Sequence, residues 1–313
     1  MSFIKKKCIE SRHRFFVGLA ICFGVAIASP ASFGQEKGAN NLATRLANLE
    51  KQIEEERKKQ HIPGVAIAVI KDVKVVFAKG FGYSDIETEQ RVTPETLFAV
   101  GSTTKAFTST LIGMLADDSK MSWDDPVAKH IPEFRLKVDT GDEKVTVRDL
   151  LCHRTGFTRM GVLWAAGRLT RPEVIELAAT AEPYSDFRKK FLYNNVMYMA
   201  AGLAAGKAVD SDWESLVTAR ILNPLNMTDS TTSIMDAKKD ERLAKGYVWD
   251  EDKLMHKRLP MRNLYLIGPA GSINSNVKDM AQWVRFQLGK GEYEGKRLLG
   301  LETHAETWKS RSK

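Results

Sequence analysis

Apolar residues recur along this chain with two different periods, and these periods divide it into an α/β part and a helical part. Four apolar residues at helical spacing within residues 42–53, with charges between them, predict a surface helix with one buried stripe. The β-branched runs at 65–70 and 74–79 predict two strands joined by a turn at 71–73. Because Val73 is unfavourable at positive φ, we expect a turn other than the usual two-residue type.

From Thr93 onward the pattern is mostly helical. Capping boxes are predicted where a hydroxyl residue precedes an acidic residue by three positions, at Thr146/Asp149, Thr170/Glu173 and Ser211/Glu214. Residues 195–208 are apolar nearly all round and predict a deeply buried helix. A last long helix is predicted from Val277 to Leu288, with Ser275 as its N-cap and Gly289 at its end. The order of elements predicts one α/β layer and one all-α layer with a cleft between them.

The first residues have the pattern of a secretory signal rather than of a folded core. Five basic residues precede an apolar run at 15–28, and the small residues Ser32 and Gly34 follow it. We therefore predict a signal peptide at 1–34, a periplasmic or secreted protein, and no membrane association after cleavage. An uncleaved anchor is the alternative. Cys22 follows Ile21 rather than a small residue, which argues against lipidation.

The basic charge of the chain belongs largely to this leader. Lys and Arg number 47 against 39 Asp and Glu, a net charge of +8. The leader holds five of the basic residues and one of the acidic ones, so 42 against 38 remain, a net charge of +4. No basic stripe interleaved with aromatics is left, which disfavours nucleic acid as a partner. Cys152 is then the single cysteine, so an intrachain disulfide is excluded.

Ser102 and Lys105 stand three residues apart, which places a hydroxyl and an amine on one face of a helix. A partly desolvated lysine loses its proton near neutral pH and can then take the proton of the serine. Three other pairs share the spacing, namely Ser2/Lys5, Ser275/Lys278 and Ser310/Lys313. Only Ser102 follows an apolar approach and opens a periodic apolar run. The alternative is a capping serine with an exposed lysine.

Tyr193 lies just before the predicted buried helix, and Asn195 is its first residue. A tyrosine hydroxyl can relay a proton when a lysine is near, and an asparagine amide offers both a donor and an acceptor to a substrate. The alternative is an aromatic anchor followed by an asparagine N-cap.

These two pairs, with five further segments in the same order, resemble the serine β-lactamase superfamily. That group includes class C β-lactamases, D,D-peptidases (penicillin-binding proteins) and related esterases and peptidases. The five segments are Ile62–Ala66, Thr96–Phe98, Leu150–Gly156, Pro224–Met227 and Gly268–Ser272. Asn226 stands where the family more often has glycine.

The resemblance implies an α+β fold, an antiparallel sheet flanked by helices beside an all-α subdomain. It implies that Ser102 is the acyl-accepting nucleophile and Lys105 its base. Tyr193 would relay a proton to the leaving group, and Asn195 would hold the acyl side chain of the substrate. The implied activity is a serine hydrolase acting on β-lactam, D-peptide or ester substrates, with no cofactor and no metal. The alternative is a weak or inactive protein that binds cell-wall peptides or β-lactams.

One family motif has no counterpart here, the Lys-Thr-Gly or His-x-Gly tripeptide expected after Gly271. The tripeptide at 154–156 precedes Tyr193, so we interpret it as a structural turn with Gly156 at the bend, and His153 as a hydrogen-bonded structural residue. After the last long helix only a Gly-rich, charged stretch and a polar helix from Leu301 are expected. We therefore expect the C-terminal strands of the sheet to be missing, and weak or no turnover.

Other hydrolase classes find less support. There is no Gly-x-Ser-x-Gly motif, and the six histidines have no metal-ligand spacing. We predict one hydrolase domain at 35–313, with an α/β part at 35–92, a mainly helical part at 93–265 and a return to the α/β part at 266–313. The partner is a small-molecule or peptide substrate. The residues do not distinguish a β-lactam, a D-peptide and an ester, and they leave the oligomeric state open.

Overall fold

A computed structural model of the chain describes residues 38–138 and 144–311. The chain divides into two units, Met1–Gly38 and Ala39–Lys313, and the fold below is that of the second unit. The signal peptide predicted at 1–34 lies outside the described residues. None of the helices in the two described segments is long and apolar enough to cross a membrane.

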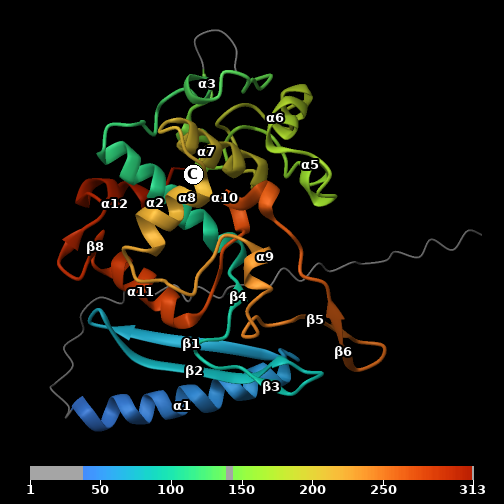
Figure 1. Cartoon of the computed structure of the whole chain (residues 1–313), viewed down its shortest axis with the longest axis vertical. Helices are drawn as coiled ribbons and strands as arrows, with labels where there is room; N and C mark the ends of the chain where they lie inside the picture. Colours follow the sequence, from blue (N-terminus) through green and yellow to red (C-terminus); the bar gives the residue numbers. More distant parts are fainter. Residues whose placement is uncertain (1–37, 139–143, 312–313) are drawn as a thin grey trace, which may run out of the picture. The chain divides into compact units, whose positions relative to one another are not determined.

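The described residues form an α+β fold with short antiparallel sheets (Figure 1). The strands are β1 (Gly64–Lys71), β2 (Lys74–Asp85), β3 (Gln90–Arg91), β4 (Phe98–Ala99), β5 (Gly246–Asp250), β6 (Met255–Leu259), β7 (Asn274–Ser275), β8 (Glu292–Tyr293) and β9 (Lys296–Arg297). The α-helices are α1 (Gly38–Lys59), α2 (Thr104–Asp117), α3 (Val127–His130), α4 (Val147–Leu151), α5 (Val162–Ala165), α6 (Arg171–Thr180), α7 (Asn195–Lys207), α8 (Trp213–Val217), α9 (Ile234–Ala237), α10 (Gly268–Gly271), α11 (Val277–Leu288) and α12 (Leu301–Thr307). Single turns of other helix types are η1 (Gly101–Thr103), η2 (Thr218–Leu222) and η3 (Tyr265–Ile267).

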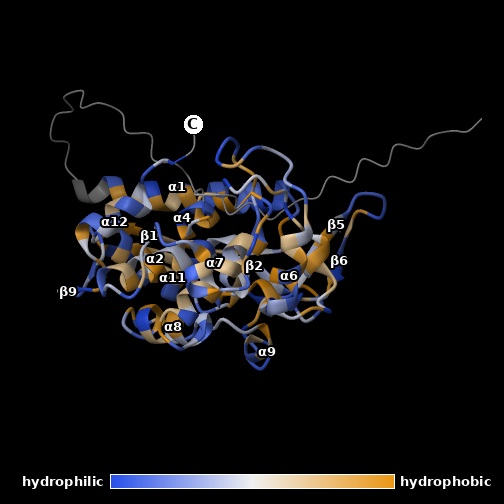
Figure 2. Cartoon of the chain, turned by 90° about the horizontal axis from the view of Figure 1, so that it is seen from above, coloured by the Kyte–Doolittle hydropathy of each residue, from blue (hydrophilic) through white to orange (hydrophobic). Residues whose placement is uncertain are grey.

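The α/β part consists of a three-stranded antiparallel sheet between two helices. The strand order is β1-β2-β3, with α1 along one face and α11 over the other (Figure 1). Hydrophobic and hydrophilic residues alternate along α1, as its predicted single buried stripe requires (Figure 2). Glu50 of α1 pairs with Lys79 of β2, and Arg285 of α11 donates to the carbonyl of Val73 over 2.8 Å. Both helices are therefore tied to the same hairpin.

The turn of this hairpin corrects our expectation. Lys71 pairs with Lys74 across a two-residue turn, and Asp72 and Val73 have φ of 50° and 61°. Two positive φ values are what a tight hairpin needs to match the twist of its strands. The strain of a β-branched residue in this region is offset by the eight-residue pairing of β1 and by the hydrogen bond from Arg285 to Val73.

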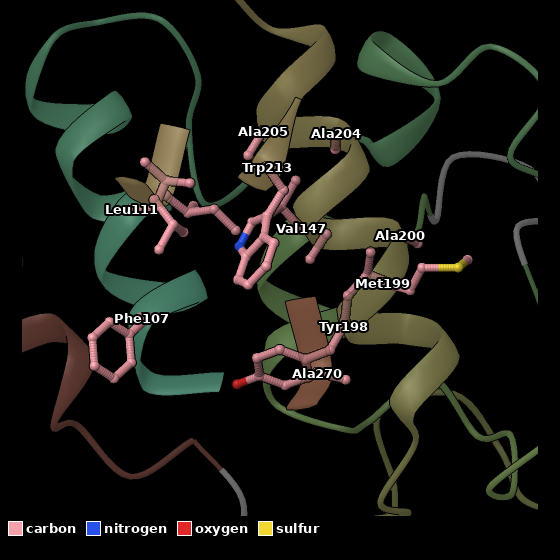
Figure 3. Close-up of a cluster of buried hydrophobic side chains, with 14 of the residues drawn as sticks. Phe107, Leu111, Val147, Tyr198, Met199, Ala200, Ala204, Ala205, Trp213 and Ala270 are labelled. Carbon is pink, nitrogen blue, oxygen red and sulfur yellow. The ribbon is translucent and has the colours of Figure 1, made fainter. Parts of the chain in front are cut away.

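The helical part packs around α2, which contacts α7, α8, α10 and α12. Trp213 of α8 is 1% exposed and lies between α2, with Phe107 and Leu111, and α7, with Ala204 (Figure 3). The predicted apolar helix at 195–208 is α7, and most of its side chains are fully buried. This core fixes the direction in which the first turn of α2 points.

Two of the three predicted capping boxes are confirmed, and one is wrong. Thr146/Asp149 and Thr170/Glu173 form complete boxes at α4 and α6. At α8 the cap is Asp212, which accepts from the Ser215 N–H over 2.7 Å, rather than Ser211. Glu214 is engaged elsewhere, because its carboxylate binds Arg171.

The boundaries of α11 are as predicted, Val277 to Leu288 with Gly289 at the end. Its N-cap is Asn276, which accepts from the Asp279 N–H over 2.9 Å, and not Ser275. Ser275 lies in β7, and its hydroxyl bonds that of Ser230 over 2.7 Å. Strand β7 pairs with β4, so this segment of the chain is drawn against the approach to α2.

Strands β5 and β6 form a hairpin that we did not predict from the helical pattern. Trp249 of β5 stacks on His61 with ring centroids 3.7 Å apart, and His256 of β6 bonds the carbonyl of His61 over 2.7 Å. Both contacts join the hairpin to the turn after α1, which lies 188 residues before Trp249 and 195 before His256. Such a long-range contact has no local sequence signal.

Candidate active site

The predicted nucleophile is positioned by a short strand and a sharp turn. Strand β4 pairs with β7, the Val100 N–H donates to Ile273 O over 3.0 Å, and Gly101 then turns the chain with φ of 55°. Ser102 lies in η1 and its residue is exposed, whereas Lys105, one turn later in α2, is 7% exposed. The structure therefore places the hydroxyl at the surface and the amine behind it.

Lys105 Nζ has three hydrogen-bond partners. It lies 3.2 Å from Ser102 Oγ, 2.8 Å from Asn195 Oδ1 and 2.7 Å from the backbone oxygen of Ala270. The two carbonyl oxygens can only accept hydrogen bonds. A neutral amine therefore gives its two hydrogens to Asn195 and Ala270. Its lone pair then faces the one partner that can donate, the Ser102 hydroxyl.

The environment of Lys105 favours that neutral form. Burial, and secondarily the positive charge of Arg159, lower the pKa of Lys105 from 10.5 to about 7. Removing an ammonium from water disfavours its charged form, and the aromatic faces of Tyr193 and Tyr198, 4.6 and 5.3 Å from Nζ, replace water around it. The condition that we set for a basic lysine is met near neutral pH.

Tyr193 and Asn195 both reach this site, from the start of α7. The Tyr193 hydroxyl lies 2.5 Å from Ser102 Oγ. The helix cap is Asn194, whose Oδ1 accepts from the N–H groups of Val196 and Met197 over 2.9 and 3.3 Å. Because Asn194 caps the helix, the side chain of Asn195 is free to bond Lys105, which answers the alternative that Asn195 is merely an N-cap.

His153 supports the segment that carries Tyr193. Its Nδ1 accepts from the Asn194 N–H over 3.1 Å, and its backbone oxygen accepts from Leu192 over 2.7 Å. The imidazole ring lies tilted by 40° against the Tyr193 ring with centroids 4.6 Å apart. Burial, and secondarily the charge of Lys105, lower the pKa of His153 to about 4, so the ring is neutral at physiological pH. These contacts agree with the predicted structural role.

Gly156 forms the bend that we predicted for the 154–156 tripeptide. Its φ is 88°, and a Cβ there would lie 2.4 Å from the carbonyl oxygen of Ser185. The Tyr184 N–H donates to Gly156 O over 2.8 Å. Only glycine permits both the positive φ and this close approach. The bend joins residues 153–156 to the segment that leads to Tyr193.

A buried carboxylate ties the same two segments together. Asp149 has a fully buried side chain and lies in an ion pair with each of Arg154 and Arg188. It also completes the capping box with Thr146. Burial alone would raise the pKa of Asp149, but the hydrogen bonds from Arg188, Thr146 and Arg154 outweigh it and the pKa is lowered. The carboxylate is therefore charged and holds both arginines.

The segment at α10 contributes a backbone group that the sequence did not reveal. Besides Ala270 O, the oxygen of Pro269 accepts from Thr108 of α2 over 2.7 Å. Gly202 of α7 permits this approach, because a Cβ there would lie 2.3 Å from Pro269 Cγ. Gly268–Ser272 was part of the family resemblance, but a carbonyl has no residue-type signature. Its role therefore could not be read from the sequence.

Two further features border the site. Arg159 lies with its guanidinium carbon 5.3 Å from the Tyr193 ring centroid. A cavity of about 240 Å³ is lined by residues 164–167 and 262–264. Its lining residue Leu264 lies next to Gly271, as does the backbone of Gly101.

Within the described residues no three His, Cys, Asp or Glu side chains come together as a metal site would require.

Comparison with known proteins points in one direction. The sequence profile of the Beta-lactamase family matches residues 49–312. The unguisins hydrolase ungD of Aspergillus violaceofuscus is 34% identical over 254 residues, covering 76% of this chain and 44% of that protein. Protein flp of Staphylococcus aureus is 29% identical over 255 residues, covering 78% of this chain and 50% of flp. The chain thus spans about half the length of the curated relatives it matches.

Solved structures agree with these relatives. The octameric penicillin-binding protein homologue from Pyrococcus abyssi superimposes with a TM-score of 0.75 at 30% identity, over 85% of this chain and 60% of that one. FmtA from Staphylococcus aureus superimposes with a TM-score of 0.69 at 20% identity, over 82% of this chain and 68% of FmtA. The second likeness concerns the fold alone.

Proposed function

This chain belongs to the Beta-lactamase family, and from that premise we propose that it is a serine hydrolase that forms an acyl-enzyme on Ser102. One observation carries the proposal. Two of the three hydrogen-bond partners of Lys105 Nζ, Asn195 Oδ1 and Ala270 O, can only accept, and the third partner is the Ser102 hydroxyl. A buried amine in this arrangement is a base aimed at one proton.

The proposed reaction begins with transfer of the Ser102 proton to Lys105 Nζ. Ser102 Oγ then forms a bond to the carbonyl carbon of the acyl donor, whose C–N or C–O bond breaks as the tetrahedral intermediate collapses. The leaving group takes a proton from the Tyr193 hydroxyl, and the proton held by Lys105 restores that hydroxyl. Water hydrolyses the resulting ester in the second half of the reaction.

Asn195 is proposed to have two functions. Its Oδ1 binds Lys105, which leaves the two hydrogens of its Nδ2 for the carbonyl oxygen of a substrate amide. The exposed position of Ser102 next to the buried Lys105 and the half-buried Asn195 makes the candidate nucleophile reachable from outside. For this chain we propose an ester, a D-peptide or a β-lactam as acyl donor, with a general hydrolase preferred over a dedicated resistance enzyme. We further propose that it acts after export.

Intact-protein mass spectrometry tests the proposal. Incubation with a fluorophosphonate or with penicillin should add one adduct to the protein, and Ser102→Ala should abolish it. Ser109→Ala, a change on the same helix whose hydroxyl bonds Ala106 O over 3.1 Å, is the matched control and should label normally. An adduct that survives Ser102→Ala would overturn the proposal.

The same samples distinguish hydrolysis from capture. An adduct that disappears with time, together with product release from nitrocefin, p-nitrophenyl esters or D-Ala-D-Ala peptides, supports a hydrolase and identifies its substrate class. An adduct on Ser102 that persists would instead indicate a protein that binds such compounds without turning them over.

A further inference from the structure

A second cavity borders Tyr198, and none of its lining residues takes part in the acyl transfer proposed above. Residues of α2, α4, α7 and α12 contribute to its wall. We call it the Tyr198 cavity. Its volume is about 110 Å³, and its lining includes Trp123, Arg148, Cys152, Tyr198, Glu306 and Arg311. Because a protein cavity of about 150 Å³ accommodates benzene, the Tyr198 cavity has room for a group of a few heavy atoms.

Two groups in this cavity are without a partner. The Cys152 thiol is free and its residue is half-buried. Tyr198 is only 8% exposed and extends from α7 toward α2 (Figure 3), yet its hydroxyl makes no hydrogen bond within residues 38–138 and 144–311. The charged lining residues differ, because Arg148 and Arg311 both bind Glu306. A buried hydroxyl normally has a partner, so that of Tyr198 is available to a group that enters the cavity.

The surroundings of Cys152 favour reaction with a reagent held in the cavity over one in bulk solvent. Burial raises the pKa of this thiol, and three positive charges oppose that rise in part, those of Arg154, Arg148 and Arg311. Since the thiolate is the nucleophilic form, a thiol with a raised pKa reacts slowly with dissolved reagents. A cavity that holds a small reagent beside the sulfur raises the effective concentration of that reagent.

We propose that Cys152 is a modification site that binds small thiols as mixed disulfides inside the Tyr198 cavity, and that this modification slows the acylation of Ser102. The Cys152 thiolate attacks one sulfur of a low-molecular-weight disulfide and forms a new S–S bond with it. The S–S bond of the reagent breaks, and its other half leaves as a thiolate that takes up the proton lost by Cys152. The disulfide reagent is itself the oxidant.

Tyr198 connects the modification to the candidate active site. Its ring centroid lies 5.3 Å from Lys105 Nζ and 5.1 Å from that of His153, the residue that follows Cys152. Because protein interiors are close-packed, a group added beside the Tyr198 ring displaces it. A displaced ring admits water to Lys105 Nζ and favours the ammonium, which cannot accept the Ser102 proton. This slowing rests on the proposed function, whereas the uptake of a thiol does not.

Two reagents of different size test the uptake on the full chain with Cys8→Ser and Cys22→Ser, in which Cys152 is the single thiol. Methyl methanethiosulfonate transfers a methylthio group, and benzyl methanethiosulfonate transfers a group larger than the cavity. Intact-protein mass spectrometry should show that the native chain takes the methyl group at least about tenfold faster, because overpacking is costly. In urea the two rates should become similar, and Cys152→Ser should abolish both. No modification of the native chain, or the same rate ratio in both states, would overturn the proposal.

Fluorophosphonate labelling of Ser102 tests the slowing. The methylthio-modified chain should label about three- to tenfold more slowly than the unmodified chain, and dithiothreitol should restore the rate. The pH of half-maximal labelling should move upward, which a merely structural effect would not cause. Cys152→Ser and Cys152→Ala, treated with the same reagent, are the controls and should keep their rates. Equal rates with and without the modification, or slowing without the pH shift, would overturn the slowing. No labelling of Ser102 in any form would overturn the proposed function and the slowing, while the mass measurement decides the uptake separately.

Discussion

The Tyr193 hydroxyl lies 2.5 Å from the Ser102 hydroxyl, although 91 residues separate the two along the chain. The ring centroid of the same tyrosine lies 4.6 Å from Lys105 Nζ and 5.3 Å from the guanidinium carbon of Arg159. Tyr193 therefore contacts the candidate nucleophile, its base and the exposed charge at once. The hydroxyl and the ring can be separated by mutation.

Tyr193→Phe should slow the labelling of Ser102 about 10²–10⁴-fold if the hydroxyl moves a proton in the transition state. The ring, and with it the contacts to Lys105 and Arg159, stays in place, so the fold should be retained. Tyr198→Phe is the matched control, because its ring also lies near Lys105, at 5.3 Å, and it should change the rate by less than about threefold. Equal rates for the two variants would show that the Tyr193 hydroxyl takes no part.

Lys105→Arg should slow acylation nearly as much as Lys105→Ala, by about 10²–10⁴-fold. Arginine keeps the positive charge but does not lose its proton in a protein, so it cannot accept one from Ser102. Stopped-flow measurement of the first turnover with a p-nitrophenyl ester gives the rate. Lys278→Arg, a change at a surface lysine paired with Glu95, should leave it unaltered. Near-normal acylation in Lys105→Arg would show that Lys105 contributes only its positive charge.

The acylation rate should rise with pH and reach half its maximum near pH 7. Lys105 acts only when unprotonated, and its pKa is about 7, so protons bind the base below this pH and leave it above. His153 does not account for such a limb, because its pKa is about 4, and burial raises the pKa of the Cys152 thiol above 9.0. A pH-independent rate between pH 5 and 9 would contradict the assignment.

Asn195→Asp should move this limb to higher pH. The new carboxylate would lie 2.8 Å from Lys105 Nζ, where it favours the ammonium and raises the pKa of Lys105 by about one unit or more. At pH 7 the acylation rate should then fall, and part of it should return at pH 9. Asn195→Ala removes the acceptor without adding a charge, so the rise of its acylation rate should not move to higher pH. The pair of pH profiles separates the electrostatic effect from the loss of a contact.

Asp149→Asn should lower the free energy of unfolding by about 1–3 kcal/mol, because the hydrogen bonds from Arg154 and Arg188 lose their buried charged acceptor while both guanidinium groups stay partly exposed. Asp124→Asn, which removes a 65% exposed partner of Arg148, should cost about 0–1 kcal/mol. Urea denaturation measures both values. Since Arg154 and Arg188 link residues 153–156 to the segment that leads to Tyr193, labelling of Ser102 should also slow in Asp149→Asn. Similar stabilities of the two variants would contradict the role of this ion-pair cluster.

The elements that follow from short-range chemistry were predictable from the sequence. The spacing of Ser102 and Lys105 places them on one helix face whatever surrounds the helix, and Gly289 ends α11, where a Cβ would lie 2.3 Å from the carbonyl oxygen of Glu292. The buried helix at 195–208 followed from its apolar composition alone. Each prediction needed only residues within a few turns of one another.

The predictions were wrong where a distant part of the chain binds the side chain in question or holds its backbone in another conformation. Glu214 has the right spacing for a capping box, but Arg171 binds its carboxylate. Val73 disfavours positive φ, but the pairing of β1 with β2 and the bond from Arg285 hold it there. Local preferences are worth about 1 kcal/mol or less, so tertiary contacts of similar size override them.

The sequence by itself thus determined the family, and it singled out Ser102 as the candidate nucleophile and Lys105 as its candidate base. Tertiary structure alone decided that Lys105 is buried, that Asn195 Oδ1 and Ala270 O lie within hydrogen-bond distance of its amine, and that Arg159 lies over the Tyr193 ring. The physical reason is that a pKa depends on burial and on charges brought from distant segments. A backbone carbonyl, moreover, is the same group in every residue. Only the packing of α2 against α7 and α10 brings these groups to one point.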